Sequence, residues 1–445
     1  MLFASTNRSY RVRSFYVYLS FYYNDFAFIH ISPNDRMKFS HSTTLALAAS
    51  LVSAAPSTHT FVPRNGTANS TTLSRKLIVG GAGQIIALDF NGTAFVPTKD
   101  NYTDTGKVAS WMAFKEPNRL YAVDENSNGT RLFGFDPNGG SLSKELGVLN
   151  GSAGVVHLAF DTEQTRLIGS SYGEGSIDVW DSTNPDGSLK YIKKISLTGT
   201  HGPDPVSQTQ LRAHQAVLDP SGNFFAVNDL GGDAIHILDT RNDAYRLLNT
   251  TVKLAAGAGP RHGAFISLKG GHYATHYVVV CELSNEIHLF DVSYSNTTGM
   301  GMNFMSKVST YGPAFPPANA TSAAAGELVI ASSGAIYVSN RLSGNKTDSI
   351  SHFALEKKSA TDSTPILAFQ SQISSGGIAP RMMSLSKDQS VMFATNMNGE
   401  NGVVALSRDS KTGMLAEKPL AVMLNSEFST QPAGQGFGPL FIQEL

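Results

Sequence analysis

The sequence predicts an all-β protein, a seven-bladed β-propeller made of four-stranded antiparallel blades. Glycine is abundant, with 41 among 445 residues, and stretches with helical periodicity are scarce. Short alternating or apolar segments separated by turn residues recur along the chain, which is typical of strands. They repeat about every 47 to 65 residues, which matches one four-stranded propeller blade.

Six complete units follow one another, each with an inner strand, a second strand, a third strand and a weaker fourth. The inner strands are expected at Trp111–Phe114, His157–Phe160, Gln215–Leu218, Gly263–Ile266, Leu328–Ala331 and Met382–Leu385. The second strands are expected at Leu120–Val123, Arg166–Ser170, Phe224–Val227, Tyr277–Cys281, Ala335–Val338 and Val391–Ala394.

A seventh blade is expected to be shared between the two ends of the propeller. Lys76–Val79 and Gln84–Phe90 resemble second and third strands that no inner strand precedes. Gly438–Gln443 resembles an inner strand that nothing follows. Pairing these segments closes the ring and removes the exposed sheet edge. Strand pairing has to hold the ring closed, because the single cysteine, Cys281, can form no intramolecular disulfide.

The N-terminal region predicts secretion. Residues 37–54 have the layout of a signal peptide, with Lys38 first, an apolar segment at Thr43–Val52 and small residues before a cut after Ala54. Residues 1–36 are interpreted as an extension from a start assigned too far upstream. A genuine extension or membrane anchor is the alternative, although Asn24 and Asp25 interrupt its apolar run. A flexible leader at 55–75 then precedes the propeller at 76–445.

Glycosylation motifs favour the same extracellular location. Sequons of the form Asn-x-Ser/Thr stand at Asn65, Asn69, Asn91, Asn101, Asn128, Asn150, Asn249, Asn296, Asn319 and Asn345. The net charge of −1 and the absence of a basic run argue against a nucleic-acid partner. No membrane association is expected once the signal peptide has been removed, and the sequence does not indicate an oligomeric state.

Polar residues gather where inner strands begin and second strands end. Both positions lie on one face of a propeller, around a central mouth. The residues entering inner strands are His157, His214, Arg261, His262 and Arg381. Those leaving second strands are Glu125, Tyr172, Asp229, Glu282, Arg341 and Asn396. Ion pairs that only tie neighbouring blades together would give the same pattern and remain the alternative.

Several phrases connect the chain with a known family. They are AHQAVLDPSGNFFAVNDLGGDAIHILD, GPRHGAF, VVVCELSNEIHLFD, AIYVSNRLSGNKTDSISHF and APRMMSLSKDQSVMFATN. Through them residues 75–445 resemble the seven-bladed propeller lactonases, which include bacterial 6-phosphogluconolactonases and fungal carboxy-cis,cis-muconate cyclases. The chain looks like a secreted, fungal-type member. The Gly270–His276 turn and Leu342 depart from the usual pattern at the rim, so the resemblance implies no particular substrate.

The resemblance implies four catalytic residues. They are His214 before an inner strand, Arg261 in the GPRH phrase, Glu282 in the ELSN phrase and Arg341 in the SNR phrase. The remaining polar residues of the mouth that are expected to bind substrate are His157, Asp229, His262, Arg381 and Glu125.

The four residue types suit lactone chemistry. Arg261 and Arg341 can hold a carboxylate and stabilise an oxyanion. Glu282, near two arginines, is expected to favour its ionised form and to move a proton, and His214 to activate water or protonate a leaving oxygen. No cofactor and no metal are expected, because the sequence lacks HExxH, clustered cysteines and an Asp-rich calcium loop.

The sequence therefore predicts a metal-independent lactonase or a muconate-type cycloisomerase that acts on a small carboxylate or sugar lactone. A secreted glycoprotein propeller that binds a partner without catalysis is the alternative function. The string Gly169–Gly173 matches G-x-S-x-G, but a strand follows it instead of a helix, which argues against a nucleophilic Ser171.

Overall fold

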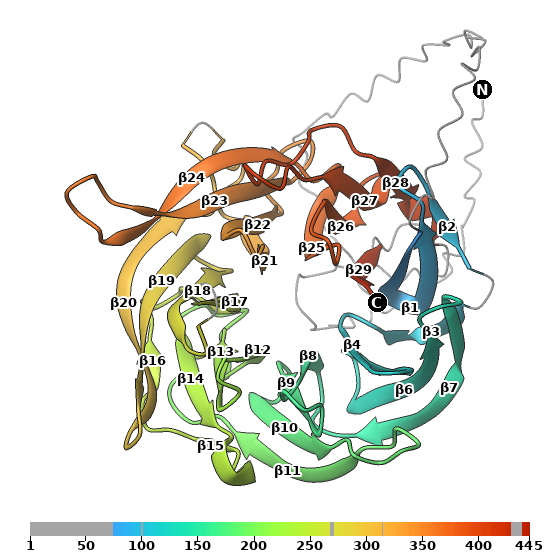
Figure 1. The fold of residues 1–445 in the computed structure, drawn as a ribbon, viewed down its shortest axis with the longest axis horizontal. Helices are drawn as coiled ribbons and strands as arrows, with labels where there is room; N and C mark the ends of the chain where they lie inside the picture. The colour runs from blue at the N-terminus through green and yellow to red at the C-terminus, as the bar shows by residue number, and fades with distance from the viewer. Residues whose placement is uncertain (1–73, 99–100, 268–270, 314, 429–437) are drawn as a thin grey trace, which may run out of the picture. The chain divides into compact units, whose positions relative to one another are not determined.

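The protein folds as a seven-bladed β-propeller. The computed structural model describes residues 74–98, 101–267, 271–313, 315–428 and 438–445. Within these ranges, 29 strands form seven antiparallel sheets around one axis, with two short 3₁₀ helices, Arg241–Asp243 and Asn425–Glu427 (Figure 1). Among the same residues no helix has the length and apolar character needed to cross a membrane. The expected extension, signal peptide and nearly all of the leader, with Asn65 and Asn69, lie outside the described residues.

Six blades follow the chain order, each with its first strand at the axis (Figure 1). The first three are β4 (Met112–Lys115), β5 (Arg119–Val123), β6 (Gly129–Asp136) and β7 (Ser141–Asn150); β8 (Val155–Phe160), β9 (Arg166–Ser171), β10 (Ser176–Asp181) and β11 (Lys190–Ser196); and β12 (Ala213–Leu218), β13 (Phe224–Asp229), β14 (Ala234–Asp239), β15 (Arg246–Leu247) and β16 (Val252–Lys253). The next three are β17 (Pro260–Ser267), β18 (Ala274–Cys281), β19 (Glu286–Ser295) and β20 (Gly299–Ser309); β21 (Ala324–Ile330), β22 (Ala335–Arg341), β23 (Ser349–Lys357) and β24 (Pro365–Ser374); and β25 (Ile378–Leu385), β26 (Val391–Asn398), β27 (Asn401–Ser407) and β28 (Ala421–Leu424).

The seventh blade closes the ring as predicted. Its inner strand is β29 (Pro439–Glu444), which pairs with the first half of β1 (Arg75–Phe90) from Leu77 opposite Glu444 to Gly80 opposite Phe441. The second half of β1 pairs with β2 (Phe95–Pro97) and β3 (Tyr102–Val108). The two short strands expected in this region are one continuous strand, with Gly83 at a φ of 77° between the two halves.

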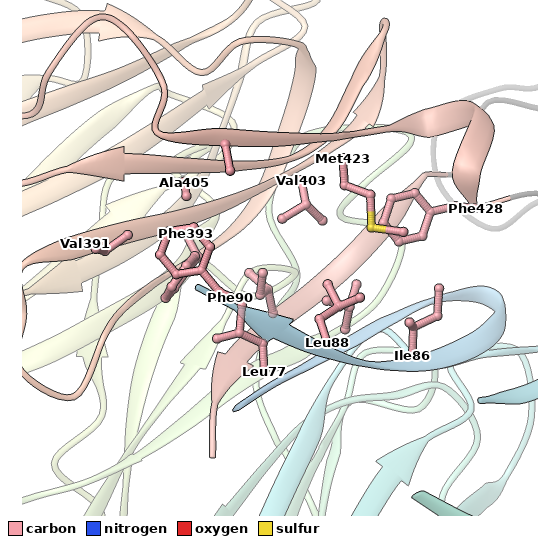
Figure 2. Packing of buried hydrophobic residues seen from close by; sticks show 13 residues of the cluster. Leu77, Ile86, Leu88, Phe90, Val391, Phe393, Val403, Ala405, Met423 and Phe428 are labelled. Atoms are coloured by element: carbon pink, nitrogen blue, oxygen red, sulfur yellow. The ribbon is translucent and has the colours of Figure 1, made fainter. Parts of the chain in front are cut away.

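Apolar side chains fill the space between neighbouring blades. In the cluster of Figure 2, Leu77 and Phe90 of β1 pack against Val391 and Phe393 of β26. The rings of Phe90 and Phe393 meet edge to face at 5.3 Å between centroids. The closing blade is therefore held by side-chain packing on its neighbour as well as by the β1–β29 ladder, and the ring keeps the starts of the inner strands close together at the axis.

Candidate active site

β-bulges at the starts of the inner strands place several of the predicted site residues. The pairing register skips His214 between Ala213 and Gln215 of β12. It skips Arg261 in β17 and Arg381 in β25 in the same way. A bulge adds an unpaired residue and changes the direction of its side chain. His214, Arg261 and Arg381 are thus the extra residues of these bulges, whereas His157 and His262 are paired with Ser170 and Val280 of the next strands.

A buried carboxylate lies between two arginines at the centre of the site. Glu282 follows the last residue of β18 and has no exposed surface. Its Oε2 atom is 2.8 Å from Nε of Arg261 and 2.9 Å from Nη2 of Arg341. The Glu282 backbone N–H donates to the carbonyl of Gly259 at 2.8 Å. The structure therefore brings three of the four expected catalytic residues into direct contact.

The inner strand β21 fixes both arginine side chains, that of Arg261 from the preceding blade and that of Arg341 from its own blade. Nη1 of Arg261 donates to the carbonyl oxygen of Gly326 at 3.0 Å, and Nη2 of Arg341 donates to that of Ala325 at 2.9 Å. Gly326 is needed for this approach, because a Cβ there would lie 2.5 Å from Oγ of Ser339 and 3.1 Å from Nε of Arg341. The guanidinium groups are thereby anchored to the backbone at the start of β21.

A second network holds the backbone around Arg261. Gln215 accepts the Gly263 N–H at 2.7 Å, and the amide of Asn228 donates to the Arg261 carbonyl at 3.3 Å. The hydroxyl of Tyr277 donates to Asn228 at 3.0 Å. A side chain at position 263 would collide with the Tyr277 hydroxyl and lie 2.7 Å from the Val278 carbonyl. The glycine after Arg261-His262 in the GPRHG phrase therefore makes room for the tyrosine that supports the site.

Three histidines and one tryptophan line the axis beside the ion pairs. The ring of His214 lies 5.0 Å from that of His262, and the ring of His157 lies 6.0 Å from His262 and 4.4 Å from Trp111, between centroids. Nδ1 of His214 and Nδ1 of His157 are buried and accept or donate no hydrogen bond within the described residues.

Burial controls the protonation of these groups. It holds the pKa of His214 well below its ordinary value, and the positive charge of Arg261 lowers that pKa further. Burial also raises the pKa of Glu282, and the charges of Arg341 and Arg381 only oppose that rise. The arginines favour the ionised glutamate, as expected, but the loss of solvent outweighs their attraction, so the net shift of the Glu282 pKa is opposite to the expected one.

The other predicted residues fall into two groups. Arg381 forms an ion pair with Glu125 at 2.6 Å, with side chains 17% and 12% exposed, so this pair is the most accessible part of the cluster. Asp229 pairs with Ala213 beside His214, and its carboxylate bonds to groups outside the arginine cluster. Its Oδ1 accepts the N–H groups of Arg212 and Gly232, and its Oδ2 lies 3.2 Å from Nε2 of His236. This carboxylate ties the turn after β13 to the segment before β12, and its expected part in substrate binding stays a prediction.

Glu327 is a site residue that the sequence analysis missed. Its Oε1 lies 2.6 Å from Nδ1 of His262 and accepts the Leu328 N–H at 3.0 Å. Burial raises the pKa of Glu327 to about 8, against the opposing charge of Arg261. Glu327 stands directly before the expected inner strand at Leu328, where other blades carry histidine or arginine, and that equivalence was the available signal.

The donor atoms near the axis do not form a recognisable metal site. Within the described ranges, no group of three or more histidine, cysteine, aspartate or glutamate side chains is arranged to hold a metal ion.

Comparison with known proteins agrees with this architecture. The family model described as lactonase, 7-bladed beta-propeller, matches residues 68–428. A probable 6-phosphogluconolactonase of Arthroderma benhamiae is 28% identical over 333 residues, which cover 74% of this chain and 80% of that protein. An uncharacterised protein of Lactococcus lactis is 25% identical over 349 residues, or 77% of this chain and 95% of that protein.

Solved structures share the fold. A putative 6-phosphogluconolactonase of Bacteroides uniformis superposes with a TM-score of 0.67 at 19% identity, covering 84% of this chain and 99% of that one. The periplasmic gluconolactonase of Pseudomonas aeruginosa gives a TM-score of 0.65 at 19% identity, with 83% and 98% covered. At this identity the likeness concerns the fold alone. The family match covers most of the chain, and the chain therefore belongs to the seven-bladed β-propeller lactonase family.

Proposed function

We propose that this protein hydrolyses a small lactone, with His214, Arg261, Glu282 and Arg341 as its catalytic residues. The observation that carries the proposal is the buried carboxylate of Glu282 between two arginines, 2.8 and 2.9 Å away. Membership of the lactonase family and the similarity to a probable 6-phosphogluconolactonase support hydrolysis as the reaction.

The directions of the pKa shifts indicate a different role in the reaction for each group. A water oxygen bonds to the lactone carbonyl carbon while His214, which burial keeps neutral, takes a proton from that water. The carbonyl oxygen becomes an oxyanion, and the guanidinium groups of Arg261 and Arg341 stabilise its charge. As the bond from the carbonyl carbon to the ring oxygen breaks, Glu282 gives its proton to that oxygen. Proton transfer from His214 to Glu282 then restores both groups.

The substrate class follows from the charges at the accessible end of the site. Arg381 and Glu125 retain partly exposed side chains there, and they can bind a carboxylate and hydroxyl groups, respectively. We therefore propose a sugar lactone or a lactone with a carboxylate. Muconate-type cycloisomerisation remains a variant of the proposal, because it needs the same arginines and the same proton transfers.

One observation favours a second candidate, a propeller that binds a partner without catalysis. Arg261, Glu282 and Arg341 are at most 5% exposed and are paired with one another, as they would be in a purely structural ion cluster. Secretion and glycosylation are compatible with both candidate functions. All eight sequon asparagines among the described residues are exposed, which supports their modification outside the cell.

The test is a screen of the purified full chain against aldonolactones and carboxymuconates, with products identified by NMR. Hydrolysis predicts an open-chain hydroxy acid from a lactone, whereas cycloisomerisation predicts a lactone from a carboxymuconate. Binding of these compounds without any turnover would contradict the enzymatic proposal and favour the binding module. Mass spectrometry of protein secreted by a eukaryotic host would show glycans on the exposed sequons if the extracellular location is right.

A further inference from the structure

A cavity runs along the propeller axis on the side away from the ion pairs. It has a volume of about 520 Å³. Its lining includes Gln215 and Glu327 near the beginnings of inner strands, and Ile330, Leu385 and Glu444 at or near the ends of theirs. The cavity therefore follows the inner strands from the depth of the candidate site toward the ends of β21, β25 and β29.

Glu327 belongs to the cavity and to the site at once. Its Oε1 is hydrogen-bonded to Nδ1 of His262 and to the Leu328 N–H. Its Oε2 is buried and has no hydrogen-bond partner among the described residues, and the whole residue is 3% exposed. The lining is mostly apolar, but Gln215, Gln443 and Glu444 also contribute polar groups, and a cavity of this size can hold water that would pair with that oxygen. On the other side, the ring of His262 lies 5.0 Å from that of His214.

We propose that the Glu327–His262 pair is a proton relay between the catalytic residues and the axial cavity, so that protons leave by the face opposite to substrate entry. In this role Glu327 is a positioning and proton-transfer residue that acts through His262 and does not touch the substrate. The inference rests on the proposed lactone hydrolysis, because that reaction releases one proton per turnover when the product acid ionises.

The relay balances in two steps. The Nε2 atom of His262 takes the proton that the product acid releases while its Nδ1 gives a proton to the ionised carboxylate of Glu327, and no net charge remains on the ring. Glu327 then passes its proton to water in the cavity and is ionised again. The 2.6 Å separation between Oε1 and Nδ1 is short enough for direct transfer.

The surrounding charges suit a carboxyl group that exchanges its proton near neutral pH. Arg261 from β17, Arg341 from β22 and Arg381 from β25 all act on Glu327, while burial raises its pKa to about 8. His262 faces the same three arginines and is held well below its ordinary pKa by burial. His214 and His157 lie beside the ring of His262, Glu282 lies between Arg261 and Arg341, and Lys387 and Glu444 line the cavity with Glu327. Glu327 is therefore the member of the pair that changes its ionisation near neutral pH.

The first test needs no substrate. In the full chain with ¹⁵N-labelled histidine, the Nδ1 signal of His262 is expected to titrate with a midpoint near pH 8 as Glu327 ionises, without the ring becoming charged. Glu327→Gln removes that titration, and Glu286→Gln, which changes a glutamate on β19 bonded to His288 and Lys307, leaves it in place. A His262 signal that is flat between about pH 6 and 9 in the unmodified protein would overturn the relay.

The second test measures the reaction. Glu327→Gln is expected to lower kcat by roughly 10-fold or more, with KM within about twofold, and to remove the limb of the kcat profile near pH 8. Glu327→Asp, which keeps an ionisable group, is expected to recover part of kcat and the limb. A lower kcat with an unchanged pH profile would assign Glu327 a purely structural role and overturn the relay. If the unmodified chain hydrolyses no lactone, the proposed function fails, and the His262 titration alone decides whether the proton pair exists.

Discussion

Replacing Glu282 by glutamine isolates the charge of the buried carboxylate, since the side chain keeps its shape but can neither ionise nor transfer a proton. If Glu282 protonates the leaving oxygen, kcat falls by about 10² to 10⁴-fold. KM is expected to change less, because Arg261, Arg341 and the Arg381–Glu125 pair remain to bind substrate.

The structure also sets the stability cost of this change. Glu282→Gln leaves two buried arginines without the carboxylate that lies 2.8 and 2.9 Å from them. Removing one partner of a buried ion pair typically costs about 3 to 5 kcal/mol. The raised pKa of Glu282 means that burial already opposes its charge, so we expect the lower end of that range. For a domain of roughly 370 residues with an unfolding entropy of about 2.1 cal/mol/K per residue, Tm falls by about 4 °C.

The assay combines initial rates on the best lactone of the screen with calorimetric Tm values for the full chain. Glu286→Gln is the matched control. This glutamate lies at the start of β19, 2.8 Å from Nζ of Lys307 and 3.1 Å from Nε2 of His288, and its side chain is 23% exposed. We expect its replacement to leave kcat unchanged. Full turnover by the folded Glu282→Gln variant would refute the catalytic role of Glu282.

Three further predictions concern the supports of the site. Arg341→Lys is expected to lower kcat/KM by about 10² to 10³-fold, because a compact ammonium replaces the planar guanidinium whose Nη2 contacts both Glu282 and the Ala325 carbonyl. Steady-state kinetics would check this, and an equal loss for the exposed Arg246→Lys would speak against it. Gly263→Ala is expected to lower the free energy of unfolding by about 1 to 3 kcal/mol, because the added methyl group collides with Tyr277. Gly147→Ala, with no atom near its Cβ, is expected to have little effect. Equal midpoints of urea denaturation for the two variants would contradict the packing argument. Protonated Glu327 is expected to stabilise the fold most below about pH 4.5 and progressively less toward about pH 8, because its folded pKa of about 8 exceeds its ordinary value of 4.5. The measurement is the Tm of the unmodified chain minus that of Glu327→Gln across this pH range. A Tm difference that rises with pH would contradict the raised pKa.

The sequence was sufficient for the blades because their signal is local. Each strand alternates or is apolar over a few residues and ends in a turn, so the second strands Phe224–Val227 and Ala335–Val338 could be located without knowing their partners. Ring closure was predictable for the same reason, since a lone inner strand at 438–443 and two strands near residue 80 complete one blade.

The details of the site depend on contacts between blades, which no local pattern encodes. The bulges of β12, β17 and β25 exist only in the register with the next strand, and the missed Glu327 lies in the unpaired stretch between Ala325 and Leu328. The side chain of Asp229 was assigned to the mouth from its position at a strand end, but it accepts one backbone N–H from the turn that follows, at Gly232, and one from Arg212 before β12. The pKa of Glu282 is set by burial, which became visible only in three dimensions.

The cost of burying these charges separates catalysis from structural pairing. An ion cluster at the axis is a weak source of stability, because desolvation of each buried ion costs several kcal/mol and apolar groups of similar volume do as well or better. Simultaneous replacement of Arg261 by Met, Glu282 by Leu and Arg341 by Met is therefore expected to leave the free energy of unfolding unchanged or to raise it by up to about 4 kcal/mol, while turnover is lost. Glu282→Gln alone would destabilise the same protein, because it leaves two arginines unpaired. If the triple variant is less stable than the single one in urea denaturation, the cluster serves mainly to hold the blades together, and the case for a catalytic axis weakens.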